Sequence, residues 1–77
     1  MPKLPIIKDR ELLKALKQLG FFEHRQKGTS HLIIADNSGN RSTIPIHSGR
    51  DIPTGTLKAI LRDLNISVEA LVNALKK

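Results

Sequence analysis

Apolar residues recur at helical spacing near both ends of the chain, and this pattern constrains the fold more than any other feature. A spacing of three and four residues places apolar side chains on one face of a helix. The pattern occurs in residues 9–19, in residues 54–64 and again after Ser67. Its members are Leu12, Leu13, Leu16 and Leu19, then Leu57, Ile60, Leu61 and Leu64, and finally Val68, Leu71, Val72 and Leu75. Each predicted helix therefore has one apolar face that the rest of the fold must cover.

Capping residues predict where these helices begin and end. Asp9 is a suitable N-cap for the first helix. Gly20 is predicted to end it in the left-handed conformation, which glycine adopts at the lowest cost. The other predicted caps are Thr54 or Thr56 at the start of the second helix, Asn65 at its end, and Ser67 at the start of the third.

The segment between the first two helices predicts three antiparallel strands, at residues 21–27, 31–36 and 41–46. Glycine and asparagine mark the turns at residues 28–30 and 37–40. Side chains alternate between the two faces of a sheet. If Leu32 and Ile34 face the helices, His31 faces away from them. On the third strand, we expect Ile44 and Ile46 to point inward and Thr43, Pro45 and His47 to point outward. Pro45 cannot donate a ladder hydrogen bond, which favours an edge position for this strand or its end at that residue.

The predicted fold class is α+β, with the order α-β-β-β-α(-α). A three-stranded antiparallel sheet with helices packed on one face buries all the apolar stripes. The 77 residues are expected to form a single domain, 1–77. Residues 1–5 contain two prolines and are predicted to be a loose N-terminal arm.

The amino-acid composition indicates the cellular compartment and the class of binding partner. The formal net charge of +6 favours a polyanionic partner, nucleic acid first and an acidic protein second. The absence of cysteine excludes disulfides and thiolate zinc sites and favours a cytoplasmic location. The sequence has no apolar run of the length that a membrane span or a signal peptide needs, so no membrane association is expected.

Few residues are suited to catalysis. The sequence has no cysteine, no serine in a G-x-S-x-G elbow, and no Walker or dinucleotide-binding glycine pattern. We therefore expect no small-molecule cofactor. The spacing of His24, His31 and His47 matches no familiar metal-ligand pattern, so no metal site is predicted.

Histidine can act without a cofactor when the substrate is RNA. RNA supplies its own nucleophile, the 2′-hydroxyl, and a protein needs only to position the chain, move a proton and offset phosphate charge. Arg25 and Lys27 offer cations, the backbone N–H groups of Gly28, Thr29 and Ser30 offer an anion-binding turn, and His31 follows directly. Alternative interpretations are that His31 is a solvated surface residue, that the basic run only discourages strand addition, and that His47 is a loop residue or phosphate contact.

Three segments in order resemble the HicA (YcfA-like) toxins: LLKALKQLGF, RQKGTSH and STIPIHSGRDIPTGTLKAILRDLNIS. The resemblance implies a double-stranded-RNA-binding-domain-like fold, mRNA cleavage, and inhibition by an acidic-surfaced HicB-type antitoxin. In this family the histidine that closes a Gly-Ser-His turn is catalytic, which here is His31. The turn glycine and serine correspond to Gly28 and Ser30, with Thr29 between them, and the loop histidine corresponds to His47. Pro53, Gly55, Thr56 and Leu57 match the segment that begins the next helix.

Three functions follow as hypotheses. The first is a metal-independent endoribonuclease toxin in which His31 is the general acid or base and Arg25, Lys27, His47 and Arg50 contact phosphates. The second is a non-catalytic RNA-binding module of similar shape, which would recognise phosphates and helix geometry. The third is a protein-interaction domain whose basic face meets an acidic partner.

Overall fold

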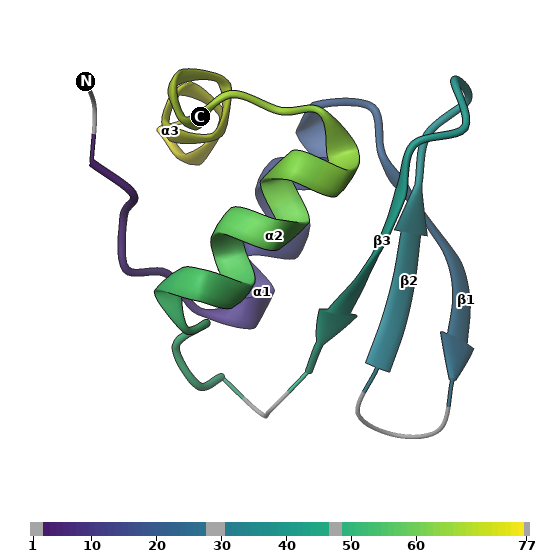
Figure 1. Cartoon of the computed structure of the whole chain (residues 1–77), viewed down its shortest axis with the longest axis horizontal. Helices are drawn as coiled ribbons and strands as arrows, with labels where there is room; N and C mark the ends of the chain where they lie inside the picture. Colours follow the sequence, from purple (N-terminus) through teal and green to yellow (C-terminus); the bar gives the residue numbers. More distant parts are fainter. Residues whose placement is uncertain (1–2, 28–30, 47–48, 77) are drawn as a thin grey trace.

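The computed structural model describes residues 3–27, 31–46 and 49–76, with the backbone alone for 25–27. The element order confirms the predicted α+β class (Figure 1). The elements are α1 (Asp9–Gln18), β1 (Phe22–Lys27), β2 (His31–Ala35), β3 (Arg41–Pro45), α2 (Thr54–Leu64) and α3 (Val68–Leu75). Each predicted strand is one residue shorter than expected, since Phe21, Asp36 and Ile46 lie outside the ladder.

The N-cap of helix α1 lies one residue earlier in the sequence than predicted. The N-cap is Lys8, and the prediction that Asp9 caps the helix is wrong. Lys8 is extended because it pairs with Asp51 in an isolated bridge, so the helix starts at Asp9 itself. The Glu11 carboxylate accepts a 2.9 Å hydrogen bond from the backbone N–H of Lys8, which satisfies one donor at the helix start.

Gly20 ends α1 as predicted, with a φ of +98°. The backbone N–H of Gly20 donates to the carbonyl of Lys17, and that of Phe21 donates to the carbonyl of Leu16. This pair of bonds is a Schellman motif, and it turns the chain from α1 into β1.

Helices α2 and α3 begin differently from one another. Neither threonine caps α2, so that prediction is wrong: Pro53 holds the N-cap position and no side chain bonds there. Asn65 ends α2 in the left-handed region at φ 58°, and the Ser67 hydroxyl accepts a 3.0 Å bond from the N–H of Ala70 at the start of α3. Both of these predictions are confirmed.

The sheet is antiparallel in the order β1-β2-β3, which makes β3 an edge strand as Pro45 predicts. The pairing of β1 with β2 shifts register between Glu23 and Arg25, which places a bulge at His24. Strand β2 pairs with β3 without a shift, from His31 opposite Pro45 to Ala35 opposite Arg41.

The helices lie on one side of the sheet, and the other face of the sheet is open (Figure 1). The core lies between these layers and is almost entirely aliphatic. Its fully buried side chains are Leu12, Leu16, Ile34, Ile44, Leu57, Ile60, Leu64 and Leu71. Helix α2 packs on β3 and α3 packs on α1. The buried Ser42 hydroxyl of β3 donates a 2.9 Å hydrogen bond to the Asp63 carboxylate of α2.

The segment that precedes α1 contacts the rest of the fold. Residues 3–5 of the predicted arm form no helix, and Leu4 among them is partly buried and packs against the core. After the arm, Ile7 is buried, and the backbone N–H of Ile52 donates to the carbonyl of Ile7 at 2.9 Å, which ties this segment to the one that precedes α2.

Candidate active site

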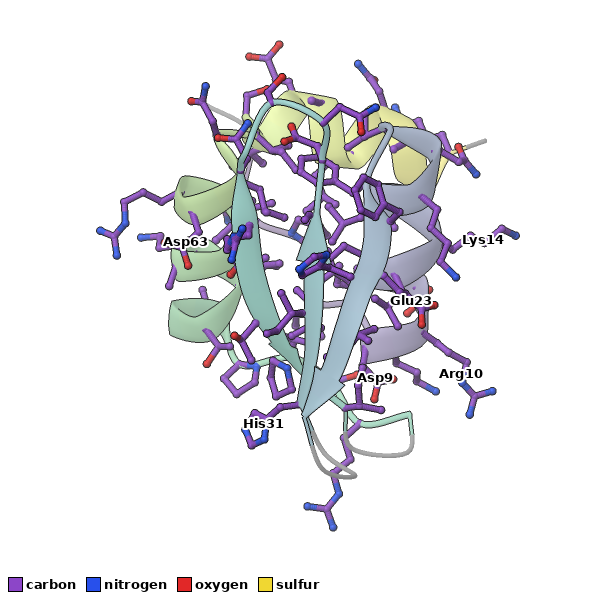
Figure 2. The ribbon with its side chains drawn as sticks, turned by 90° about the vertical axis from the view of Figure 1, so that its right-hand side faces the viewer. Asp9, Arg10, Lys14, Glu23, His31 and Asp63 are labelled. Atoms are coloured by element: carbon purple, nitrogen blue, oxygen red, sulfur yellow. The ribbon has the colours of Figure 1, made fainter. Side chains whose placement is uncertain are left out.

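His31 is the first residue of β2 and is exposed to solvent. Its neighbour Leu32 is buried, as is Ile34, so the predicted alternation is confirmed on this strand. Figure 2 shows His31 at the end of the molecule where Asp9 and Arg10 also lie. An exposed imidazole at a strand end is open to a ligand as large as a polynucleotide.

The bulge at His24 decides which residues of β1 stand opposite β2. Arg25 pairs with Ile33, and Lys27 pairs with His31. Without the bulge, His24 would stand opposite Ile33, and Gln26 would stand opposite His31. The bulge therefore brings two basic residues, rather than a histidine and a glutamine, into register with the outward-facing positions of β2.

The loop before α2 is attached to the start of α1 at the same end of the molecule. Asp9 is only 3% exposed, and its carboxylate accepts a 3.4 Å hydrogen bond from the backbone N–H of Gly49. The backbone N–H of Asp9 donates to the carbonyl of Arg50 at 3.3 Å. These contacts fix the backbone next to Arg50, whose side chain is exposed.

Arg10 adds a second exposed cation near this loop. Its Nη2 atom lies 3.5 Å from the point that a Cβ atom would occupy on Gly49, which has a φ of +85°. The sequence analysis did not select Arg10 or Asp9 for the site. Asp9 and Arg10 lie next to the loop because Lys8 and Asp51 form a bridge between segments more than forty residues apart. A contact between such distant segments gives no local signal in the sequence.

The other predicted site residues lie outside the described residues. They are Gly28, Thr29, Ser30 and His47. Of the predicted site residues, the structure therefore describes His31, the backbone of Arg25 and Lys27 beside it, and, on a separate loop held by Asp9, Arg50.

The turn between β2 and β3 is also held by a carboxylate, and its electrostatics are different. Asp36 accepts bonds from the backbone N–H groups of Ser38 and Asn40, and from the side-chain amide of Asn40 at 3.0 Å. The side-chain bond from Asn40 is the main cause that lowers the pKa of Asp36 below its ordinary value. This turn stabilises the hairpin and presents no exposed cation of its own.

Two further findings concern the residues that the structure describes. No three histidine or acidic side chains among them gather closely enough to hold a metal ion. No helix in the same part of the chain has the length and apolar character needed to cross a membrane.

His31 and the basic residues at this end of the molecule are of the types that transfer protons and bind phosphate. His31 is exposed, so a polymer ligand can reach its imidazole.

Comparison with known proteins identifies the family of the chain. Residues 10–66, well over half of the chain, match the family model described as the HicA toxin of bacterial toxin–antitoxin systems. The matched range includes α1 apart from its first residue, Asp9, together with the sheet, the Arg50 loop and α2, and it ends before α3. No curated protein sequence matches the chain.

Proposed function

The chain belongs to the HicA toxin family of bacterial toxin–antitoxin systems, and from this premise we propose that it is a metal-independent endoribonuclease that cleaves mRNA. The observation that carries the proposal is the exposed His31 at the end of β2, with Lys27 as its register partner. Folding does not require an imidazole at this position, because the core lies on the opposite face of the sheet.

His31 moves the proton in the proposed reaction. The 2′-oxygen of a ribose attacks the adjacent phosphorus and loses its proton, and the bond from phosphorus to the 5′-oxygen breaks as that oxygen gains a proton. The products are a 2′,3′-cyclic phosphate and a 5′-hydroxyl. His31 is the general base for the first transfer or the general acid for the second, and water completes the other.

Basic residues supply the electrostatic part of catalysis. Arg25, Lys27 and Arg50 contact phosphates on either side of the scissile bond, as do the turn residues 28–30 and His47. Fixed cations beside the reacting phosphate stabilise the charge that develops on it in the transition state. The buried Asp9 holds the backbone of the Arg50 loop, so we assign it a positioning role.

The family implies an antitoxin partner and an RNA target. We propose that the antitoxin is of the HicB type and that an acidic surface on it meets the basic end around His31. Opposite charges across such an interface speed association and oppose binding of RNA at the same place.

The test is cleavage of a defined RNA by the purified toxin in the presence of EDTA. We expect scission that EDTA does not slow, with products that carry a cyclic phosphate and a 5′-hydroxyl. The matched control substrate is the same sequence with every 2′-hydroxyl methylated, which should stay intact.

Three results would contradict the proposal. Inhibition by EDTA with recovery on addition of zinc would establish a metal-dependent enzyme. Cleavage of the methylated substrate would exclude the 2′-hydroxyl as nucleophile. Retention of RNA without scission would make the protein a non-catalytic RNA-binding module.

A further inference from the structure

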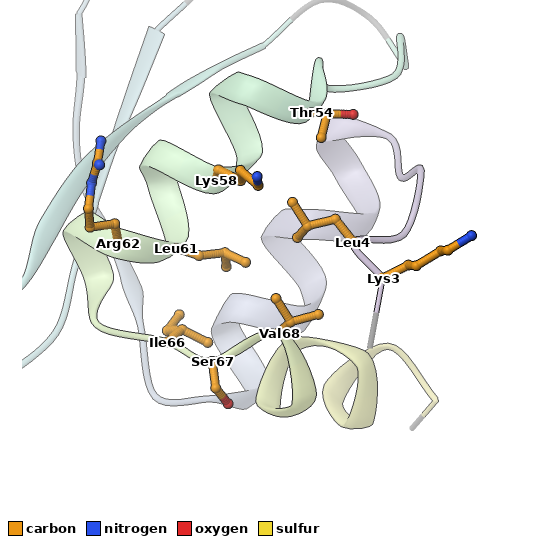
Figure 3. Close-up of a pocket in the computed structure, with 9 residues that line it drawn as sticks. All are labelled: Lys3, Leu4, Thr54, Lys58, Leu61, Arg62, Ile66, Ser67 and Val68. Atoms are coloured by element: carbon orange, nitrogen blue, oxygen red, sulfur yellow. The ribbon is translucent and has the colours of Figure 1, made fainter. Parts of the chain in front are cut away.

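A groove lies on the helix side of the molecule, between the N-terminal arm, α2 and the start of α3 (Figure 3). We call it the α2–α3 groove, and its volume is about 740 Å³. It is lined by Lys3, Leu4, Thr54, Lys58, Leu61, Arg62, Ile66, Ser67 and Val68. The catalytic proposal uses none of these residues.

The floor of the α2–α3 groove is apolar. Leu61 is buried, whereas Leu4, Ile66 and Val68 are partly buried and pack against the core from the solvent side. Partly exposed aliphatic side chains in a concavity gain free energy when a ligand removes them from water. A ligand with apolar side chains of its own would therefore be held by this floor.

The rim of the groove is basic. Lys3, Lys58 and Arg62 line it, all three are exposed, and no acidic residue is among the lining side chains. Lys58 and Arg62 are four residues apart on α2, so they lie on the same face of the helix. Within the part of the chain that the structure describes, none of these three cations forms an ion pair.

The composition of the groove favours a protein segment over other ligands. Single-stranded nucleic acid is usually held by aromatic side chains that stack on bases, and the lining has none. A bilayer is reached by side chains that project from a surface, whereas the apolar side chains here line a groove, with Lys3 and Arg62 on its two opposite sides (Figure 3). Side chains on a partner helix or extended segment can enter such a recess.

We propose that the α2–α3 groove binds an acidic amphipathic segment of the antitoxin, with aliphatic side chains on the floor and carboxylates at Lys3, Lys58 and Arg62. This inference rests on the antitoxin partner proposed above but not on the catalytic role of His31. Helices α2 and α3 and the N-terminal segment lie on the side of the molecule away from the open face of the sheet (Figure 1), and none of the lining residues belongs to the site proposed for RNA cleavage.

Part of the groove lies outside the segment that matches the family model. Lys3 and Leu4 precede residue 10, and Ser67 and Val68 follow residue 66. Contacts with these residues give an antitoxin a means to distinguish this toxin from others that share only the matched segment.

The test is the affinity of toxin variants for the purified antitoxin encoded beside the toxin gene, measured by calorimetry. K58E/R62E reverses two rim charges and should weaken binding at least about tenfold, which corresponds to about 1.4 kcal/mol. The matched control, K14E/K76E, makes the same change in net charge at exposed positions outside the groove and should bind with an affinity close to that of the wild type. Circular dichroism establishes that both variants are folded.

RNA cleavage without antitoxin separates this proposal from the catalytic one. K58E/R62E should cleave RNA at the wild-type rate, because the groove takes no part in the reaction. Wild-type affinity of K58E/R62E for the antitoxin would overturn the groove proposal, as would an equal loss in K14E/K76E, which would reflect net charge alone. A loss of RNA binding in K58E/R62E with antitoxin binding intact would assign the groove to nucleic acid and overturn it too.

Discussion

The covered face of the sheet and the end that carries His31 differ in what fixes their residues. In the core on the covered side of the sheet, Leu16 of α1, Ile34 and Ile44 are fully buried, and burial alone explains why they are aliphatic. At the His31 end, the exposed residues could be replaced by many polar types without loss of core packing. The comparison teaches that packing fixes the residue types of the first region, whereas in the second region packing leaves the residue types free to serve the proposed chemistry.

Asp9 belongs to both regions. It starts α1, whose apolar face forms part of the core, and its buried carboxylate holds the loop next to Arg50. If the two regions are independent apart from this link, a substitution in one should leave the other unchanged, whereas a change at Asp9 should affect both.

The largest expected effect on stability is in the core on the covered side of the sheet. Leu16→Ala removes a side chain with no solvent exposure, and the cavity it leaves should cost about 2–5 kcal/mol of unfolding free energy. Urea denaturation measures this loss. Leu19→Ala on the same helix is the control, because Leu19 is 36% exposed and its loss should be much smaller. Equal losses in the two variants would show that burial does not distinguish them.

The next effect tests the link between the regions. Asp9→Ala leaves the N–H of Gly49 without its carboxylate acceptor and should cost about 1–3 kcal/mol. RNA cleavage, measured at a temperature at which the variant is folded, should also slow because the Arg50 loop is no longer held. Asp51→Ala removes an exposed carboxylate from the same loop and should change neither property.

A double variant tests whether Asp9→Ala slows RNA cleavage through its effect on Arg50. Asp9→Ala should slow cleavage in the wild type but add little in the Arg50→Ala variant. An undiminished effect in that background would mean that Asp9 does not act by positioning Arg50.

Local signals predicted most of the fold because local physics decides those features. Gly20 and Asn65 end helices in the left-handed region, and Ser67 caps α3. The alternation around Leu32 and Ile34 predicted the buried face of β2. These features depend on a residue and its near neighbours in sequence.

Some of the features that were missed depend on contacts that are distant in sequence. Asp9 is a plausible cap by type, but the bridge from Lys8 to Asp51 extends the arm and moves the cap to Lys8. The proposed role of Asp9 at Gly49 has the same origin. The bulge at His24 was also missed, and it sets which basic residues stand opposite β2.

The smallest expected effect concerns the β2–β3 turn. The lowered pKa of Asp36 means that its ionised form is favoured in the folded state, so the stabilisation is present above the unfolded pKa of about 3.9 and is lost as the pH falls through the lower folded value. Asp36→Ala should lower the melting temperature at neutral pH, and the difference from wild type should shrink in strong acid. Ser38→Ala is the control and should leave the melting temperature unchanged. Ser38 donates to Asp36 through its backbone N–H, which alanine also has. A difference that is constant with pH would contradict this account.

The central claim is that His31 performs chemistry and contributes little to folding. The most direct test is the rate of RNA cleavage by His31→Ala and by His24→Ala, an exposed histidine of the neighbouring strand, with thermal unfolding measured on both. We predict a loss of at least about 100-fold for His31→Ala, the lower end for general acid–base catalysis, with an unchanged melting temperature and wild-type cleavage by His24→Ala. Cleavage by His31→Ala at the wild-type rate would contradict the account.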